Sequence, residues 1–196
     1  IAFISDIHIG SMWNPESELE KLSSVVNSTG ADVILFGGDL VNLHHSELSQ
    51  PILDRLSLIK ARHGVFAVMG NHDTGSYVKG STKEFRTENM ASLARSVSSS
   101  GWTYLRDSTV YINNGTHSIA ITGIDYSEKL QEYKHSFKAI DNFDVSHIYE
   151  NIPDSVFNIT ISHLPQLWKS LCNGGYSDLT LSGHIHAMQL KYNVLG

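Results

Sequence analysis

Short apolar runs rich in β-branched residues alternate along this chain with longer stretches in which apolar residues recur at helical spacing. Short apolar runs predict buried strands, and the periodic stretches predict amphipathic helices. The predicted strands of this kind cover residues 1–7, 32–36, 65–69 and 156–161, with a last buried strand at 179–181 before residues 189–195. The alternation is typical of an α/β fold.

The first predicted helix has the clearest boundaries. Asn14 and Pro15 are a typical N-cap and first-turn pair, and Gly30 ends the periodic stretch. Three further helices are predicted from apolar stripes near residues 52–59, 90–97 and 164–171. Between them, short runs at 103–105, 110–112 and 119–124 predict an antiparallel region, with a hairpin turn at residues 113–115. Residues 126–155 are too polar to assign.

Polar residues with metal-ligand chemistry follow the predicted strands directly. Five runs end in a small residue and then a potential ligand, at Ser5-Asp6-Ile7-His8, Gly38-Asp39, Gly70-Asn71-His72-Asp73, Ser162-His163 and Gly183-His184-Ile185-His186. In open α/β sheets ligands bind beyond the carboxyl ends of the strands, so these side chains are expected to meet at one place. Each motif alone is a weak signal, because short motifs match by chance and a lone His is more often a surface or core residue. The hypothesis of a single metal site depends on all five motifs occurring together, each at the end of a predicted strand.

The number of donors predicts more than one metal ion. Asp6, His8, Asp39, Asn71, His163, His184 and His186 make seven nitrogen and oxygen donors, too many for one tetrahedral ion. Two ions that share a carboxylate fit better, in the layout used for displacement at phosphorus. Nitrogen and oxygen donors without sulfur suit Mn, Fe or Zn. The eighth residue, His72, is expected to turn its side chain toward a substrate.

Composition narrows the class of protein. The 196 residues carry 14 Lys and Arg against 20 Asp and Glu, a net charge of −6, without a basic block. This argues against a nucleic-acid partner. One cysteine, Cys172, allows no intramolecular disulfide and leaves the redox compartment open. Eleven histidines are present, of which five fall in the predicted site. No run is long and apolar enough for a membrane-spanning helix, so a soluble domain is expected.

The ordered set Asp-x-His, Gly-Asp, Gly-Asn-His-Asp, His and Gly-His-x-His resembles the pattern of the calcineurin-like metallophosphoesterase superfamily, from Asp6 to His186. The resemblance implies a four-layer αββα sandwich of two mostly mixed β-sheets flanked by helices, and a single catalytic domain over residues 1–196. It implies that Asp6, His8 and His186 hold one ion, that Asn71, His163 and His184 hold a second, and that Asp39 bridges them. It further implies attack by a metal-activated hydroxide, with His72 as the catalytic residue. Asp73 is expected to orient His72 or its loop.

Departures from other branches refine the resemblance. Gly38-Asp39-Leu40-Val41-Asn42 and Gly70-Asn71-His72-Asp73 differ from the Ser/Thr phosphatase pattern. Residues 60–73 and 121–125 look most like bacterial membrane-associated phosphoesterases, the group that is similar to UDP-diacylglucosamine pyrophosphohydrolases. A small-molecule or lipid-precursor phosphoester is therefore the expected substrate, and membrane association through segments outside this chain is an expectation of the same resemblance. Ala187-Met188-Gln189 replaces the family's frequent Gly-Gly-Gln, and the sandwich is expected to be truncated at its C-terminus.

Two functions remain open from the sequence. The leading one is a dinuclear metal-dependent enzyme that hydrolyses a phosphomonoester, phosphodiester or pyrophosphate bond. The alternative is a non-catalytic scaffold of the same fold for protein–protein contacts, which is disfavoured because all eight positions are filled. Outside the motifs, His44 and His45 are read as a solvated loop, and Trp13 and Tyr77 as a wall of the site or as packing residues.

Overall fold

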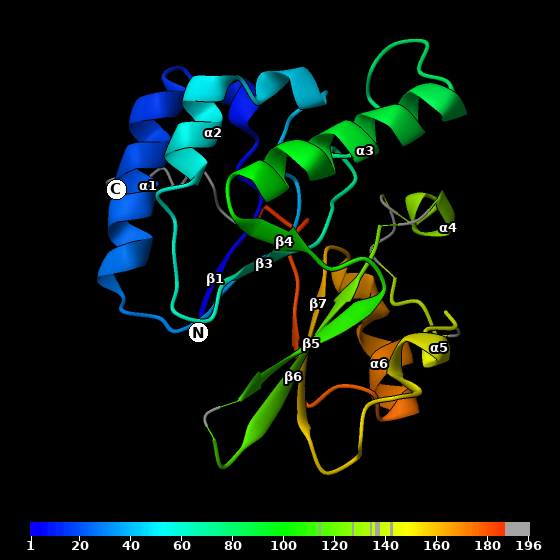
Figure 1. Ribbon diagram of the computed structural model, residues 1–196. Coiled ribbons are helices and arrows are strands. Elements are labelled where there is room, and N and C mark those ends of the chain that lie inside the picture. The colour runs from blue at the N-terminus through cyan, green and yellow to red at the C-terminus, as the bar shows by residue number, and fades with distance from the viewer. Residues whose placement is uncertain (114, 127, 134, 136–137, 142, 187–196) are drawn as a thin grey trace, which may run out of the picture.

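The computed structural model describes residues 1–113, 115–126, 128–133, 135, 138–141 and 143–186. Within these residues the strands form two four-stranded sheets (Figure 1). The first sheet is parallel throughout, in the order β1 (Ala2–Ile4), β2 (Ile34–Phe36), β3 (Val65–Ala67) and β4 (Trp102–Tyr104). The strands predicted at 1–7, 32–36 and 65–69 are therefore confirmed, with shorter hydrogen-bonded parts.

The second sheet is mixed. Its order is β5 (Ser108–Asn113), β6 (Ser118–Ile124), β7 (Phe157–Ser162) and β8 (Leu179–Leu181). Only β5 and β6 are antiparallel, which confirms the predicted hairpin, and β6, β7 and β8 run parallel.

Two sequence predictions about strands are wrong. The antiparallel region was expected to include residues 103–105, but β4 pairs in parallel with β3. The reason is the long helix between these strands, which makes a strand–helix–strand crossover and returns the chain in the same direction. The strand at 179–181 is not buried: Leu179 is 43% exposed, because β8 is the edge strand of the second sheet among the described residues.

Helices cover the outer faces of both sheets. Figure 1 places α1 (Pro15–Ser28), α2 (Gln50–Leu56) and α3 (Lys83–Ser99) on the first sheet, and α5 (Ser146–Tyr149) and α6 (Trp168–Gly174) beside the second. The remaining elements are α4 (Glu128–Gln131) and the 3-10 turns η1 (Ile9–Ser11), η2 (His45–Glu47) and η3 (Pro165–Leu167). The predicted N-cap of α1 is confirmed, because the Asn14 side chain accepts a hydrogen bond from the Ser17 N–H. None of the described helices is long and apolar enough to cross a membrane.

The alternation of side chains along the strands builds two apolar cores. In β2, Ile34 and Phe36 belong to the larger core with the helices, whereas Leu35 belongs to a smaller core. That smaller core joins Leu35 to Ile121 of β6 and Ile159 of β7, and so lies between the sheets. The order helices, sheet, sheet, helices confirms the expected four-layer sandwich. Both sheets were expected to be mostly mixed, and among the described residues only the second one is, because each connection in the first sheet is a crossover that returns the chain in the same direction. Residues 187–196, which include Ala187-Met188-Gln189, lie outside the described residues.

Candidate metal centre

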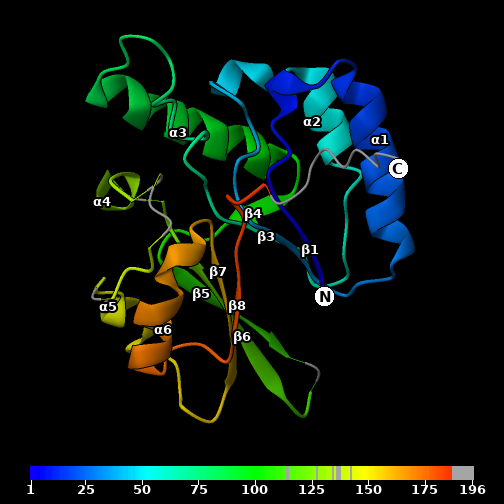
Figure 2. The same cartoon turned by 180° about the vertical axis from the view of Figure 1, so that it is seen from behind.

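The parallel strands carry all seven predicted ligands to the same side of the molecule. Each ligand follows the carboxyl end of β1, β2, β3, β7 or β8. The two sheets meet there: the end of β8 approaches the first sheet (Figure 2), and the His184 N–H lies 3.1 Å from Asp6 Oδ1. Residues almost 180 positions apart in the sequence, Asp6 and His184, are thereby neighbours.

Small residues before the ligands permit this close approach. A Cβ at Gly183 would overlap with Ser5 Oγ and would lie 2.7 Å from Asp6 Oδ2. A Cβ at Gly70 would overlap with Asp39 Oδ1 and would lie 2.6 Å from the Asp39 nitrogen. Glycine is therefore required before the ligand in these two motifs, because a side chain there would clash with neighbouring atoms of the site.

The backbone is strained at four of the seven candidate ligands. Among the described residues, those other than glycine with positive φ include Asp6 (57°), His8 (47°), Asp39 (59°) and His184 (71°). The left-handed region is unfavourable for such residues and persists where the surrounding structure fixes it, often at functional sites. The strain here aims the side chains after the strand ends toward one another.

One group of candidate ligands contains Asp6, His8, Asp39 and His186. One ligand atom from each lies within 4.8 Å of those of the others. His186 Nε2 is 3.2 Å from Asp6 Oδ1 and 3.2 Å from His8 Nε2, and His8 Nε2 is 3.7 Å from Asp39 Oδ2. The structure thus brings together the residues expected at the first ion.

The second group contains Asp39, His163 and His184, again within 4.8 Å. His163 Nε2 lies 3.2 Å from Asp39 Oδ2 and 2.9 Å from Asn71 Oδ1. The opposite ring nitrogen, Nδ1, donates to the Gly37 carbonyl at 2.8 Å, which fixes the direction in which Nε2 points. Asp39 belongs to both groups.

His72 lies beside the two groups. Its backbone N–H donates to Asp39 Oδ1 at 2.8 Å, and its ring Nδ1 donates to the Asn42 carbonyl at 2.7 Å. The ring meets the edge of the His8 ring at 4.6 Å and stacks on Tyr77 at 4.2 Å, with 11° between the planes. Tyr77 therefore packs in the site, whereas Trp13 is fully exposed.

Two carboxylates hold the loop that carries Asp39. Asp73 accepts the backbone N–H groups of residues 39, 40 and 41, together with that of Gly70, at 2.9–3.1 Å. Glu47 accepts those of residues 42, 43 and 44, together with that of Gly10, at 2.6–3.1 Å. Six consecutive N–H groups thus point to two side chains. Asp73 is expected from the sequence to orient His72 or its loop; its carboxylate accepts one N–H group of that loop, at Gly70, and three of the loop that carries Asp39.

Glu47 and Asn42 were missed by the sequence reasoning. Glu47 also closes a capping box with His44 at the start of η2, and the spacing from residue 44 to residue 47 was the available signal. His44 stacks on Phe85 with 19° between the rings, so its loop is packed rather than simply solvated.

Burial and charge act together on the carboxylates. Burial alone would raise the pKa of Asp39, but the charge and hydrogen bond of His163 bring that pKa below its ordinary value. Burial and the charge of Asp39 raise the pKa of Asp73 to about 7, against the effect of its N–H donors. Positive charge in the cluster would relieve this repulsion between buried carboxylates.

The donor set fits divalent cations. His8 and His186 direct their Nε2 atoms at each other at 3.2 Å, and His8 Nδ1 is buried with no hydrogen-bond partner among the described residues. Facing imidazole nitrogens beside two carboxylates are an arrangement that a cation satisfies better than a hydrogen bond does. Mn, Fe and Zn all accept such nitrogen and oxygen donors.

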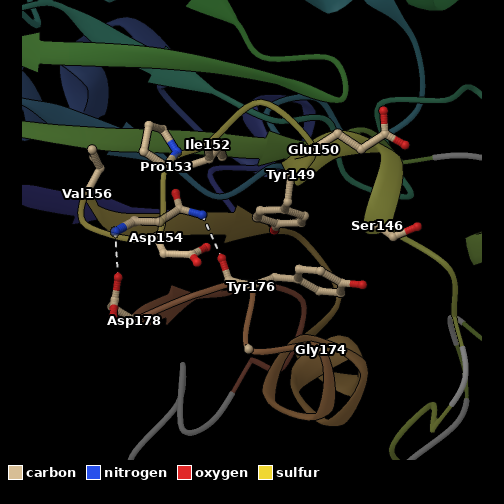
Figure 3. Close-up of a pocket in the computed structure, with 12 residues that line it drawn as sticks. Ser146, Tyr149, Glu150, Ile152, Pro153, Asp154, Val156, Gly174, Tyr176 and Asp178 are labelled. Atoms are coloured by element: carbon tan, nitrogen blue, oxygen red, sulfur yellow. Dashed lines mark hydrogen bonds between the residues drawn. The ribbon is translucent and has the colours of Figure 1, made fainter.

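A separate cavity of about 420 Å³ lies away from this centre (Figure 3). Its lining comes from residues just before β7 and β8, such as Val156 and Asp178, and from the stacked rings of Tyr149 and Tyr176. The candidate ligands follow the opposite ends of these strands, and none of them lines this cavity.

A comparison of the chain with protein families identifies a family that matches the ordered ligand set. The family described as calcineurin-like phosphoesterase matches residues 1–188, a range that includes all eight candidate site residues. The chain belongs to this family. Membership in the calcineurin-like phosphoesterases supports a hydrolase and confirms the resemblance seen in the sequence.

Individual relatives add detail. This calcineurin-like chain is 28% identical over 194 residues to an uncharacterized metallophosphoesterase of Helicobacter pylori strain J99, covering 97% of this chain and 45% of that relative. It is 36% identical over 78 residues to the UDP-2,3-diacylglucosamine pyrophosphatase LpxG of Chlamydia muridarum, covering 40% of this chain and 23% of LpxG. The chain therefore spans less than half the length of either relative.

The fold is also similar to a solved structure. The crystal structure of phosphopantetheinyl hydrolase (PptH) from Mycobacterium tuberculosis superposes with a TM-score of 0.58 at 13% identity, covering 98% of this chain and 84% of that one. At this identity the likeness establishes the fold alone.

Proposed function

We propose that residues 1–196 form a single catalytic domain that hydrolyses a phosphoester bond with two divalent metal ions. The observation that carries this proposal is the position of Asp39, whose carboxylate belongs to both groups of candidate ligands and also accepts the His72 N–H. A carboxylate shared by two ions is the arrangement that two-metal hydrolysis requires.

The residues divide between the ions as follows. Asp6, His8 and His186 would hold the first ion, Asn71, His163 and His184 the second, and Asp39 both. Mn, Fe or Zn would suit these nitrogen and oxygen donors. When bound, such ions lower the pKa of a water molecule and stabilise negative charge on a phosphoryl group.

His72 would be the catalytic residue that protonates the leaving oxygen. Its Nδ1–H is held by the Asn42 carbonyl, so Nε2 is the ring nitrogen left for proton transfer. After Nε2 gives up its proton, the neutral ring keeps the proton at Nδ1, which the Asn42 carbonyl accepts. The same hydrogen bond therefore suits the ring before and after the transfer.

The substrate class is a small-molecule or lipid-precursor phosphoester, as a monoester, diester or pyrophosphate. The partial similarity to LpxG supports a lipid precursor. Exposed apolar residues close to the ligands in the sequence support an apolar substituent: Leu43, four residues after Asp39, is 43% exposed, and Ile185, between His184 and His186, is 56% exposed. The net charge of −6 gives no support for a nucleic acid. Membrane association through segments outside this chain is part of the same proposal.

A substrate panel tests the function. The metal-loaded protein should release product from at least one of aryl phosphates, nucleotide-sugar pyrophosphates or diacylated nucleotide sugars. Asp39→Asn should abolish that turnover, whereas Glu150→Ala, an exposed acid beside the separate cavity, should keep it. A folded protein that binds two ions, turns over none of these compounds and captures a protein partner would favour the scaffold alternative.

A further inference from the structure

Tyr77 contacts two candidate site residues at once, through different parts of its side chain. Its hydroxyl accepts a hydrogen bond from Asn71 Nδ2 at 3.0 Å. Its ring stacks on the imidazole of His72, with 4.2 Å between the centroids. Asn71 and His72 belong to different parts of the proposed machinery, a metal ligand and the catalytic residue.

The hydroxyl contact occupies the nitrogen end of the Asn71 amide, and the oxygen end faces the centre. Asn71 is 2% exposed, and its Oδ1 lies 2.9 Å from His163 Nε2. Only the oxygen of a carboxamide binds a cation well, because the NH₂ group is a donor. The hydroxyl of Tyr77 gives the buried NH₂ group a partner in the orientation that directs the oxygen at His163, and its removal would leave that NH₂ group without this partner.

The ring contact acts on His72. The Asn42 carbonyl fixes one atom of the imidazole, and the Tyr77 ring covers a face of it with only 11° between the planes. A single hydrogen bond leaves a ring free to tilt, and a stacked partner removes that freedom. Together they define the direction of Nε2.

The intervening turn is built to return Tyr77 to this place. Thr74 Oγ1 donates to the Asn71 carbonyl at 2.8 Å and accepts the Ser76 N–H at 3.2 Å. Gln131 Nε2 donates to Ser76 Oγ at 2.8 Å and so ties the turn to α4. These bonds fold residues 71–77 back so that Tyr77 covers His72.

We infer that Tyr77 is a positioning residue with two separable roles: its hydroxyl sets Asn71 for the second ion, and its ring sets His72 for proton transfer. The inference rests on the proposed function for what those two residues do. Two variants separate the roles, because Tyr77→Phe removes only the hydroxyl and Tyr77→Leu removes the ring as well.

Metal affinity and turnover are measured for both variants. Calorimetric titration with Mn²⁺ should show that Tyr77→Phe lowers the affinity for one of the two ions by about 10- to 100-fold. This loss of affinity should exceed the fold-loss of kcat in the same variant. Tyr77→Leu should show the same loss of affinity and a kcat about 10-fold or more below that of Tyr77→Phe. The control is Tyr111→Phe on β5, which removes a hydroxyl that donates to the Asn151 carbonyl.

The outcomes are distinct. Wild-type affinity for both ions in Tyr77→Phe would overturn the hydroxyl role, and equal kcat values in the two variants would overturn the ring role. If the wild-type protein binds no ion, the proposed function fails, and the contacts are then tested by NMR of the metal-free protein. There the Asn71 side-chain NH₂ signals should shift in Tyr77→Phe and the His72 ring signals should shift further in Tyr77→Leu. Unchanged signals in both variants would refute the inference.

Discussion

The carboxylate of Glu47 accepts a hydrogen bond from the backbone N–H of Asn42, with 2.6 Å between Oε2 and the nitrogen. The carbonyl of the same Asn42 accepts the Nδ1–H of His72 at 2.7 Å. Glu47 therefore fixes the peptide units that orient His72, and it acts on that ring through Asn42.

Glu47→Ala should lower both turnover and stability. It leaves four backbone N–H groups without their acceptor, which costs about 1–3 kcal/mol of unfolding free energy. Misplacement of His72 should reduce kcat by about 10- to 100-fold. Urea unfolding and initial rates measure the two effects.

A double-mutant cycle separates positioning from a general loss of stability. In a His72→Ala background, Glu47→Ala should have no further effect on kcat, because the residue that it positions is gone. Additive losses of kcat would contradict the link through Asn42. Glu150→Ala is the matched control, since Glu150 is exposed and lies at the end of α5.

Asp73→Asn should destabilise the protein although it changes few atoms. The carboxylate is fully buried and receives four N–H donors, whereas an amide presents its own donors to some of them. We expect a loss of about 1–3 kcal/mol in urea unfolding of the metal-free protein. The control is Asp154→Asn, a surface change that should alter the unfolding free energy by no more than about 0.5 kcal/mol. An equally small loss in Asp73→Asn would show that the Asp73 carboxylate does not hold the loop.

Gly183→Ala should disturb the contact between the two sheets at the site. The added methyl would overlap with Ser5 Oγ, so metal binding at the group containing Asp6 should weaken. Ser5→Ala in the same chain should restore part of that affinity. Gly183 is not among the glycines with positive φ, so this substitution tests the overlap of the added methyl and not a backbone strain. Metal affinity equal to wild type in Gly183→Ala would show that the close approach is unnecessary.

Asp39→Asn should reduce the occupancy of both ions together, because one carboxylate serves both groups of ligands. Asp6→Asn is the matched carboxylate-to-amide change, and it should reduce only the occupancy of the ion held by the group that contains His8 and His186. Elemental analysis after dialysis gives the number of ions per chain. Loss of a single ion from Asp39→Asn would rule out the shared position.

The parts of the site that follow strand ends were predictable from the sequence, and the parts that depend on loop shape were not. Asp6, Asp39 and His163 follow apolar runs, and parallel strands carry such residues to one edge. Glu47 acts through backbone N–H groups, and its capping-box spacing to residue 44 does not show that its carboxylate also accepts from Asn42, Leu43 and Gly10. Tyr77 acts through a turn, and its position in the sequence does not show that its ring stacks on His72. For the same reason the direction of β4 was missed, because it is set by the crossover through α3 and not by its own three residues.

The most direct test of the central claim is the rate at which the metal-loaded protein releases 4-nitrophenolate from 4-nitrophenyl phosphate and bis(4-nitrophenyl) phosphate. We predict turnover of at least one ester that chelation abolishes. His72→Ala should keep both ions and lose about 10²- to 10⁴-fold in rate, as expected for removal of a general acid. A folded protein with two bound ions that hydrolyses neither these esters nor the nucleotide sugars of the substrate panel, or a His72→Ala variant as active as wild type, would contradict the account.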